Sequence, residues 1–347
     1  MTPASSQRTA VTVRPFRDED EPAVLDLLQE SLGGGPAGRR TPELFRWKHR
    51  DNVFGPSLML VAEADGEVVG LRAFMRWRFA SEGGSLSAVR AVDTATHRAH
   101  QGRGIFSRLT LEALELLRRE GVDLVFNTPN GKSLPGYLKM GWTPVGRFPI
   151  GVRVRHPLRF ARGARAALSG ADPSNTIENA VDTGPPANLF EREKELAELL
   201  NAQVVPAGRI ATPVDAAYLR WRYADAPGLG YRAVVDEAGG RLRGAAVFRT
   251  RSRGALREAT VAEVLVLPGE EAAVGRLLSR VGRASRADHL AVSPPAGSVA
   301  GRSLWRRGVF TAPRGVTLVV NPLREGIAPS PTLLSSWSLG LGDVEVF

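Results

Sequence analysis

Hydrophobic positions in the N-terminal part of the chain follow the two-residue period of strands in some stretches and the helical period of about 3.6 residues in others. The stretch "VTVRPF", beginning at Val11, predicts a strand, and residues 21–32 predict an amphipathic helix. A second helix is expected from Thr41-Pro42, because a capping residue precedes a proline suited to the first helical position. Two strands flank Asp65-Gly66, a strong hairpin signal.

The elements that follow complete a mixed α/β unit. They are a strand over 89–94, a helix over 104–120 that ends at Gly121, the buried strand "DLVFNT", a short helix, and strands through "FPIGVRVR". In the long helix one face is apolar and the opposite face is charged, so this helix is expected to pack on a sheet. The predicted fold class is therefore α/β (α+β).

The chain then repeats this unit. Residues 44–76 align without gaps on 218–250, at an offset of 174, with nine identities in 33 positions, Trp47/Trp221 and Phe74/Phe248 among them. A tandem duplication of a whole domain follows from this match. We expect domains at 11–159 and 189–325. A Pro/Gly/Ser-rich linker would join them over 160–188, with a disordered N-terminus over 1–10 and a C-terminal tail over 326–347.

The amino-acid composition excludes several classes of function. The chain of 347 residues has no cysteine, and its five histidines lack metal-ligand spacing, so disulfides, thiolate chemistry and metal sites are not expected. No signal-like or membrane-length apolar run occurs, which predicts a cytoplasmic protein without a membrane partner. The net charge is +10, but the arginine-rich stretch from Arg153 lacks interleaved aromatic residues. We expect a solvated face there rather than a nucleic-acid surface, and an anionic ligand remains compatible with the charge.

The segment Gln101-Gly102-Arg103-Gly104 precedes the long helix and has two interpretations. It can be a plain turn from strand to helix. It can also be an anion site, because glycines allow a close backbone approach, and the first helical turn offers unpaired amides and the positive end of the dipole. Neither the dinucleotide fingerprint nor the Walker pattern is met.

The stretch "QGRGIF" resembles the pyrophosphate-binding Gln/Arg-x-x-Gly-x-Gly/Ala loop of the GNAT N-acetyltransferase superfamily. Phe106 departs from the pattern and resembles the Eis-like branch. Downstream, "NGKSLPGYLKMGW" is similar to the segment that closes the acetyl-CoA site in these enzymes. The resemblance implies two tandem GNAT folds, each a mostly antiparallel sheet flanked by helices. The third, sterol-carrier-like domain of Eis proteins is not expected in the remaining length. The implied cofactor-binding residues are Gln101, Gly102, Arg103, Gly104, Ile105, Phe106, Asn130 and Ser133.

The implied chemistry is transfer of an acetyl group from a thioester to an amine. Such a reaction expels a thiolate, and a phenol can protonate that thiolate at neutral pH, so Tyr137 is the candidate general acid. Charge that builds on the carbonyl oxygen needs a donor, which the superfamily takes from the backbone of its fourth strand, here Thr94, Ala95 and Thr96. The same backbone would pair with the pantetheine arm of acetyl-CoA.

Two residues are candidates for the base. Asp93 ends the same strand, where an aspartate can equally be a local cap. By resemblance to Eis-like enzymes, the carboxylate of Phe347 would reach into the N-terminal site.

The second copy lacks these groups. Glu270 and Glu271 stand where the pyrophosphate would lie, and Leu304 stands at the position of Tyr137. Carboxylates at a helix N-terminus repel phosphate, so the second copy is expected to bind no acetyl-CoA and to help form the acceptor site or an assembly contact. The sequence is compatible with a homo-oligomer.

The sequence therefore predicts an acetyl-CoA-dependent N-acetyltransferase that acts directly on a small-molecule primary amine in a ternary complex. Two alternatives stay open: a transferase of this fold that uses aminoacyl-tRNA, and a non-enzymatic acetyl-CoA-binding module.

Overall fold

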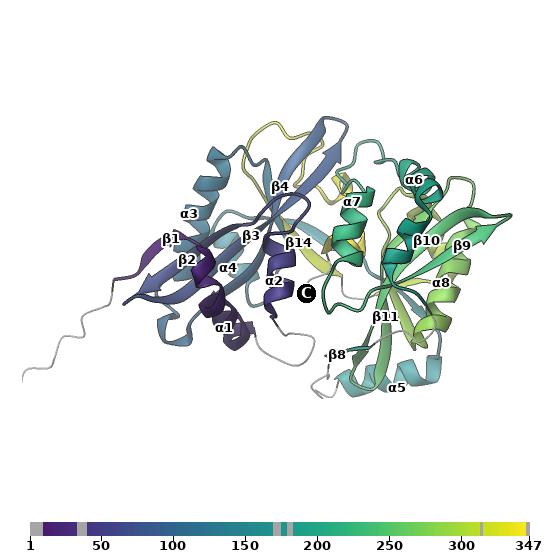
Figure 1. The fold of residues 1–347 in the computed structure, drawn as a ribbon, viewed down its shortest axis with the longest axis horizontal. Helices are drawn as coiled ribbons and strands as arrows, with labels where there is room; N and C mark the ends of the chain where they lie inside the picture. Colours follow the sequence, from purple (N-terminus) through teal and green to yellow (C-terminus); the bar gives the residue numbers. More distant parts are fainter. Residues whose placement is uncertain (1–9, 33–39, 169–174, 179–182, 313–314, 345–347) are drawn as a thin grey trace, which may run out of the picture.

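The computed structural model describes residues 10–32, 40–168, 175–178, 183–312 and 315–344, which form two sheets lying side by side (Figure 1). The first sheet has the strand order β1-β2-β3-β4-β5-β14-β6. Only β4 and β5 pair in parallel in this sheet. Its strands are β1 (Thr12–Pro15), β2 (Leu58–Ala64), β3 (Glu67–Ser81), β4 (Gly84–Thr96), β5 (Leu124–Asn127), β6 (Thr143–Phe148) and β14 (Val316–Pro322).

The second sheet has the order β13-β7-β12-β11-β10-β8, and β9 also pairs with β10. Here β11 and β12 form the parallel pair, as β4 and β5 do in the first sheet. Its strands are β7 (Gly151–Val154), β8 (Asn175–Glu178), β9 (Arg232–Ala238), β10 (Arg241–Arg253), β11 (Leu256–Val266), β12 (His289–Val292) and β13 (Phe310–Thr311).

Helices cover both faces of the two sheets, and three apolar cores lie between the helices and the sheets. One core lies between the first sheet and α3, a second lies between the second sheet and α8, and the third joins the inner faces of both sheets through α1, α2, α6 and α7. The helices are α1 (Glu21–Leu32), α2 (Pro42–His49), α3 (Ile105–Arg119), α4 (Leu134–Lys139), α5 (Pro157–Leu168), α6 (Glu193–Asn201), α7 (Ala216–Leu219), α8 (Ala272–Ser285), α9 (Val299–Ser303) and α10 (Leu341–Val344).

The two copies of the sequence exchange strands. β7, from the end of the first copy, pairs with β12 in the second sheet, and β14, from the end of the second copy, lies between β5 and β6 in the first sheet. The boundaries predicted at 159 and 189 divide the chain by its duplication, whereas the hydrogen bonds of the sheets cross them. Each sheet therefore needs both copies to be complete.

A pseudo-twofold contact joins the copies where α2 faces α7 and the helical turn Arg220–Ala224 that follows it (Figure 1). The indole N–H of Trp47 donates to the carbonyl of Trp221 at 2.6 Å, and the indole N–H of Trp221 donates to the carbonyl of Trp47 at 3.1 Å. The two rings stack with centroids 5.3 Å apart. Residues related by the offset of 174 thus contact each other reciprocally, as in an isologous interface between identical subunits.

The predicted fold class, two mostly antiparallel sheets flanked by helices, is confirmed. The hairpin between β2 and β3 turns at Asp65 and Gly66, both with positive φ, and Thr41 caps α2 by accepting from the Leu44 amide. The predicted linker 160–188 is partly regular, because α5 extends to Leu168 and β8 pairs with β10. Alanine and arginine are strong helix formers, and both are frequent in α5.

Candidate active site

The loop from Gln101 to Gly104 sits directly before α3, at the end of the long strand β4. Gly102 and Gly104 both have φ of 75°, and a Cβ at either position would meet no neighbouring atom. The side-chain amide of Gln101 donates to the Thr96 carbonyl at 3.1 Å, which ties the loop to the strand. The backbone therefore turns through conformations that favour glycine, and it leaves the first amides of a 15-residue helix accessible to an anion.

A cleft of about 730 Å³ opens beside this loop. The pairing of β4 with β5 ends at Arg90 and Phe126, whereas β4 continues to Thr96, so the two strands separate at the cleft. The cleft lining brings together nearly all predicted site residues: Asp93, Thr94, Ala95, Thr96, Gln101, Gly102, Gly104, Ile105, Phe106, Asn130, Ser133 and Tyr137. Arg103 is exposed and is not part of this lining, and Phe347 lies outside the described residues.

Asn130 shapes the turn that leads into α4. Its side-chain oxygen accepts from the amides of Lys132 and Ser133, each at 3.0 Å, and from the Ser133 hydroxyl at 3.1 Å. Asn130 therefore positions the start of the segment that carries Tyr137 while it lines the cleft.

Tyr137 lies on α4 with only 5% of its surface exposed. The Arg72 guanidinium donates to its hydroxyl at 2.9 Å and also bonds to the Thr94 hydroxyl. Arg72 is completely buried, and its Nε and Nη2 have no hydrogen-bond partner among the described residues. A buried cation without a carboxylate partner lowers the stability of the folded protein. Stability therefore does not explain why Arg72 lies behind Tyr137.

Phe106 fits this site because of its neighbours. Its ring meets that of Tyr137 edge-on at 5.7 Å, and the Arg72 guanidinium lies 5.5 Å from its centroid. A Cβ on Gly136 would come within 3.2 Å of the Phe106 ring. The bulky residue in the loop is thus accommodated by a glycine on α4.

Asp93 occupies a buried charge cluster instead of a simple cap. Its carboxylate lies 2.6 Å from the Lys48 ammonium, 2.9 Å from His49 Nε2 and 3.9 Å from Arg40. Burial alone would raise the pKa of Asp93, but Lys48, His49 and Arg40 outweigh it and hold that pKa well below its usual range. A carboxylate held ionised in this way is a weak proton acceptor, so the geometry favours Asp93 as an anchor of the cleft wall over its predicted role as base.

Replacing Asp93 by asparagine is expected to lower the free energy of unfolding by about 3–5 kcal/mol, because buried Lys48 would lose its counter-charge. Urea unfolding measures this change. Glu112→Gln is the matched control, since its pair with Arg108 is exposed on α3 and is worth less than about 1 kcal/mol. Equal effects from both variants would contradict the assigned charge cluster.

The end of the described chain reaches the wall of the cleft. The Arg90 guanidinium donates to the carbonyls of Asp343 and Val344 at 2.7 and 2.8 Å. Arg90 itself lines the cleft. The last described residues of the chain therefore lie against the same wall as the predicted site.

Residues 12–145 match the family model described as an acetyltransferase (GNAT) domain. These residues form a GNAT domain. No curated protein sequence matches the chain. Among the described residues, no helix is long and apolar enough to span a bilayer. No cluster of three or more potential ligands there could hold a metal ion.

Solved structures share the fold over both copies. A GCN5-related N-acetyltransferase from Anabaena variabilis has a TM-score of 0.58 at 10% identity, over 91% of this chain and 73% of that one. A probable N-acyltransferase from Enterococcus faecalis has a TM-score of 0.57 at 12% identity, with the same coverages. N-myristoyltransferase from Saccharomyces cerevisiae, solved with myristoyl-CoA, has a TM-score of 0.54 at 9% identity, over 91% and 84%. The GNAT domain and these neighbours support an acyltransferase.

The second copy shows what the GNAT domain has and its duplicate lacks. At the offset of 174, Arg72 corresponds to Ala246. Leu304 stands four residues before Gly308, as Tyr137 stands four residues before Gly141, and both replacements are buried. The arginine and the tyrosine that bond to each other in one copy are thus both absent from the other. Sequence reasoning missed Arg72, although the ungapped alignment of the copies contained this signal.

Proposed function

We propose that the chain transfers an acetyl group from acetyl-CoA to a small-molecule primary amine, and that the cleft of the first copy is the site of transfer. The observation that carries the proposal is the convergence of the glycine loop and Tyr137 on one cleft where β4 and β5 separate. The open glycine backbone before α3 fits a pyrophosphate, which needs amide donors and close approach. The thioester of the bound co-substrate supplies the activated acyl group.

The chain's own residues have distinct tasks in this proposal. Amides of residues 101–106 bind the pyrophosphate, and the edge of β4 at Thr94–Thr96 faces the acyl arm. Tyr137 gives its hydroxyl proton to the departing sulfur. Because Arg72 donates to the Tyr137 oxygen, that oxygen acts as acceptor toward Arg72 and keeps its own proton for another partner. The guanidinium also stabilises the negative charge that forms on the phenol oxygen.

Arg72 is thus a positioning residue, and Arg72→Met tests it. We expect kcat to fall by about 10–100-fold, the effect of losing one charged hydrogen bond, with the KM for acetyl-CoA little changed. The free energy of unfolding should stay equal or rise, because an unpaired buried charge is removed. A parallel loss of stability and activity would mean that Arg72 serves the fold alone.

The general base is a further part of this proposal. The carboxylate of Phe347 is one candidate, supported by the bonds that Arg90 makes to the backbone of Asp343 and Val344. Unchanged turnover after removal of residues 345–347 would eliminate it.

The function itself is tested by incubating the protein with acetyl-CoA and a pool of primary amines, followed by mass spectrometry. We expect N-acetylated products from a subset of the amines. Acetyl-CoA binding without any acetylated amine would favour the non-enzymatic binding module, and absence of binding would refute the proposal.

A further inference from the structure

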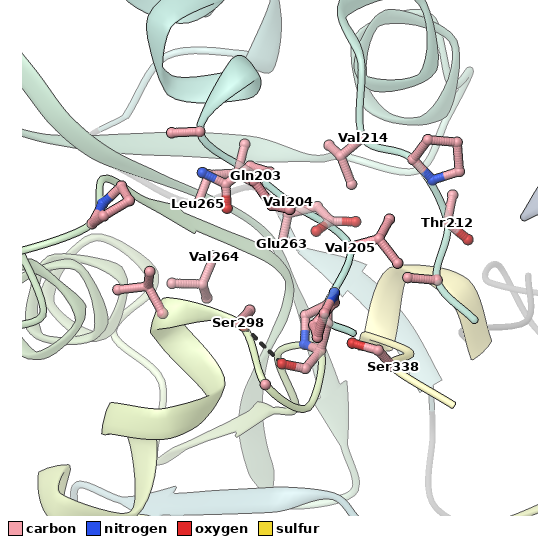
Figure 2. Close-up of a pocket in the computed structure, with 18 of the residues that line it drawn as sticks. Gln203, Val204, Val205, Thr212, Val214, Glu263, Val264, Leu265, Ser298 and Ser338 are labelled. Carbon is pink, nitrogen blue, oxygen red and sulfur yellow. Dashed lines mark hydrogen bonds between the residues drawn. The ribbon is translucent and has the colours of Figure 1, made fainter. Parts of the chain in front are cut away.

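A second cavity, of about 310 Å³, lies in the second copy, away from the GNAT cleft. Strand β11, the start of α9 and the segments 202–206 and 211–215 enclose it (Figure 2). Its walls are mostly aliphatic, with Val204, Val205, Val214, Val264, Leu265 and Val299 among them. One buried carboxyl group, that of Glu263, lies among these side chains in Figure 2, and Glu263 is only 5% exposed.

The duplication relates this cavity to the GNAT cleft. In the first sheet Ala91 pairs with Phe74, and in the second Val261 pairs with the equivalent Phe248. Two residues further along each strand stand Asp93 and Glu263. The residues that face these two carboxyl groups correspond in the same way. At the offset of 174, Arg222 stands at the position of Lys48 and Tyr223 at the position of His49. The Tyr223 hydroxyl donates to Glu263 at 2.8 Å, as His49 contacts Asp93.

The two carboxyl groups differ in their counter-charges. Asp93 has Lys48 and Arg40 within 4 Å. Among the described residues, no cation forms an ion pair with Glu263 at this distance, and Arg222 directs a guanidinium N–H to the Gly342 carbonyl at 2.7 Å. Val214 stands at the position of Arg40, and the offset holds there because Thr41 and Asp215 both cap their helices through the amide three residues on.

We propose that this cavity binds a small apolar amine as its ammonium ion, with Glu263 as the counter-charge. The aliphatic walls fit the hydrocarbon part of such a ligand, and the ammonium group supplies the positive charge that is lost where Val214 stands at the position of Arg40. Burial and the neighbouring Asp343 raise the pKa of Glu263 to about 8, and the hydrogen bond from Tyr223 and the charge of Arg222 offset only part of this rise. The site is separate from the proposed acetyl transfer and does not depend on it.

Binding of n-hexylamine and of 1-hexanol, measured by titration calorimetry at pH 8 without acetyl-CoA, tests the proposal. The two probes have the same shape, so a preference for the amine reports the charge. We expect the amine to bind at least about tenfold more tightly, the effect of one ionic contact of about 1.4 kcal/mol. Glu263→Gln should abolish the preference while it keeps an acceptor for Tyr223.

Val214→Arg is the matched variant, since it restores the residue that the first copy has at this position. Its guanidinium should pair with Glu263 and prevent amine binding. Amine binding unchanged in both Val214→Arg and Glu263→Gln would locate the ligand elsewhere, for example in the GNAT cleft, and would overturn the proposal. Equal affinity for amine and alcohol, or no binding of either, would also overturn it. Thermal unfolding of each variant checks that it folds, and Glu263→Gln alone decides the question if Val214→Arg does not.

The affinity for n-hexylamine should also rise from pH 6 to pH 8. With a pKa of about 8, Glu263 becomes ionised over this range while the amine stays protonated, so the gain is on the order of tenfold or more. The groups that face Glu263 are Tyr218, Tyr223, Arg222 and Asp343, and Asp215 and Arg302 also line the cavity. Glu263→Gln should remove this pH dependence, and its persistence in that variant would contradict the assignment.

Discussion

Tyr137→Phe is expected to lower kcat for acetyl transfer by about 100- to 10,000-fold, the range that general acid catalysis contributes. The phenylalanine keeps the ring that packs against Phe106 and Trp142, so the cleft should keep its shape. Only the proton donor and the acceptor for Arg72 are lost. Thiol release from acetyl-CoA measures the rate, and because the chain has no cysteine, a thiol reagent reports released CoA alone.

The matched control is Tyr231→Phe, which removes a buried hydroxyl in the second copy. Tyr231→Phe should leave kcat within a few-fold of wild type. In Tyr137→Phe, the affinity for acetyl-CoA should stay near that of wild type while kcat falls. A full rate with Tyr137→Phe would remove Tyr137 from the chemistry and assign its role to packing.

Gly104→Glu is expected to weaken acetyl-CoA binding by about 100-fold or more, because a carboxylate would face the phosphates at the start of α3. The change imitates the second copy, which has Glu270 and Glu271 at the equivalent loop. Titration calorimetry measures the affinity.

Gly104→Ala is the control for backbone strain, since both variants force a side chain onto a residue with φ of 75° where the space beside it is open. The alanine variant should lose about tenfold or less, and equal losses in the two variants would mean that geometry, rather than charge, limits binding.

Much of the fold was predictable from local patterns. The hairpin at Asp65-Gly66, the capped start of α2 at Thr41 and the amphipathic helix α3 depend on turn, capping and periodicity signals within a few residues. The resemblance to the superfamily identified the glycine loop and Tyr137 as candidates, and the structure brings both to one cleft, while their roles stay a prediction.

Other features depend on contacts between distant segments. The strand exchange of β7 and β14 could not be predicted from the period of either strand, because pairing partners more than 100 residues away determine it. In the sequence Asp93 resembles a strand-end cap, because its partners Lys48 and His49 belong to α2, more than 40 residues earlier, and nothing near Asp93 in the sequence indicates them. Arg72 looked like one more charged residue on a strand until Tyr137 was found to accept its hydrogen bond.

A crystal structure of the chain with CoA would show directly whether the cleft of the first copy is the site of transfer. We expect one CoA per chain, with its pyrophosphate on the amides of residues 101–106, its arm along Thr94–Thr96, and its sulfur beside the hydroxyl of Tyr137. CoA bound in the second copy, or a pyrophosphate away from the glycine loop, would contradict it.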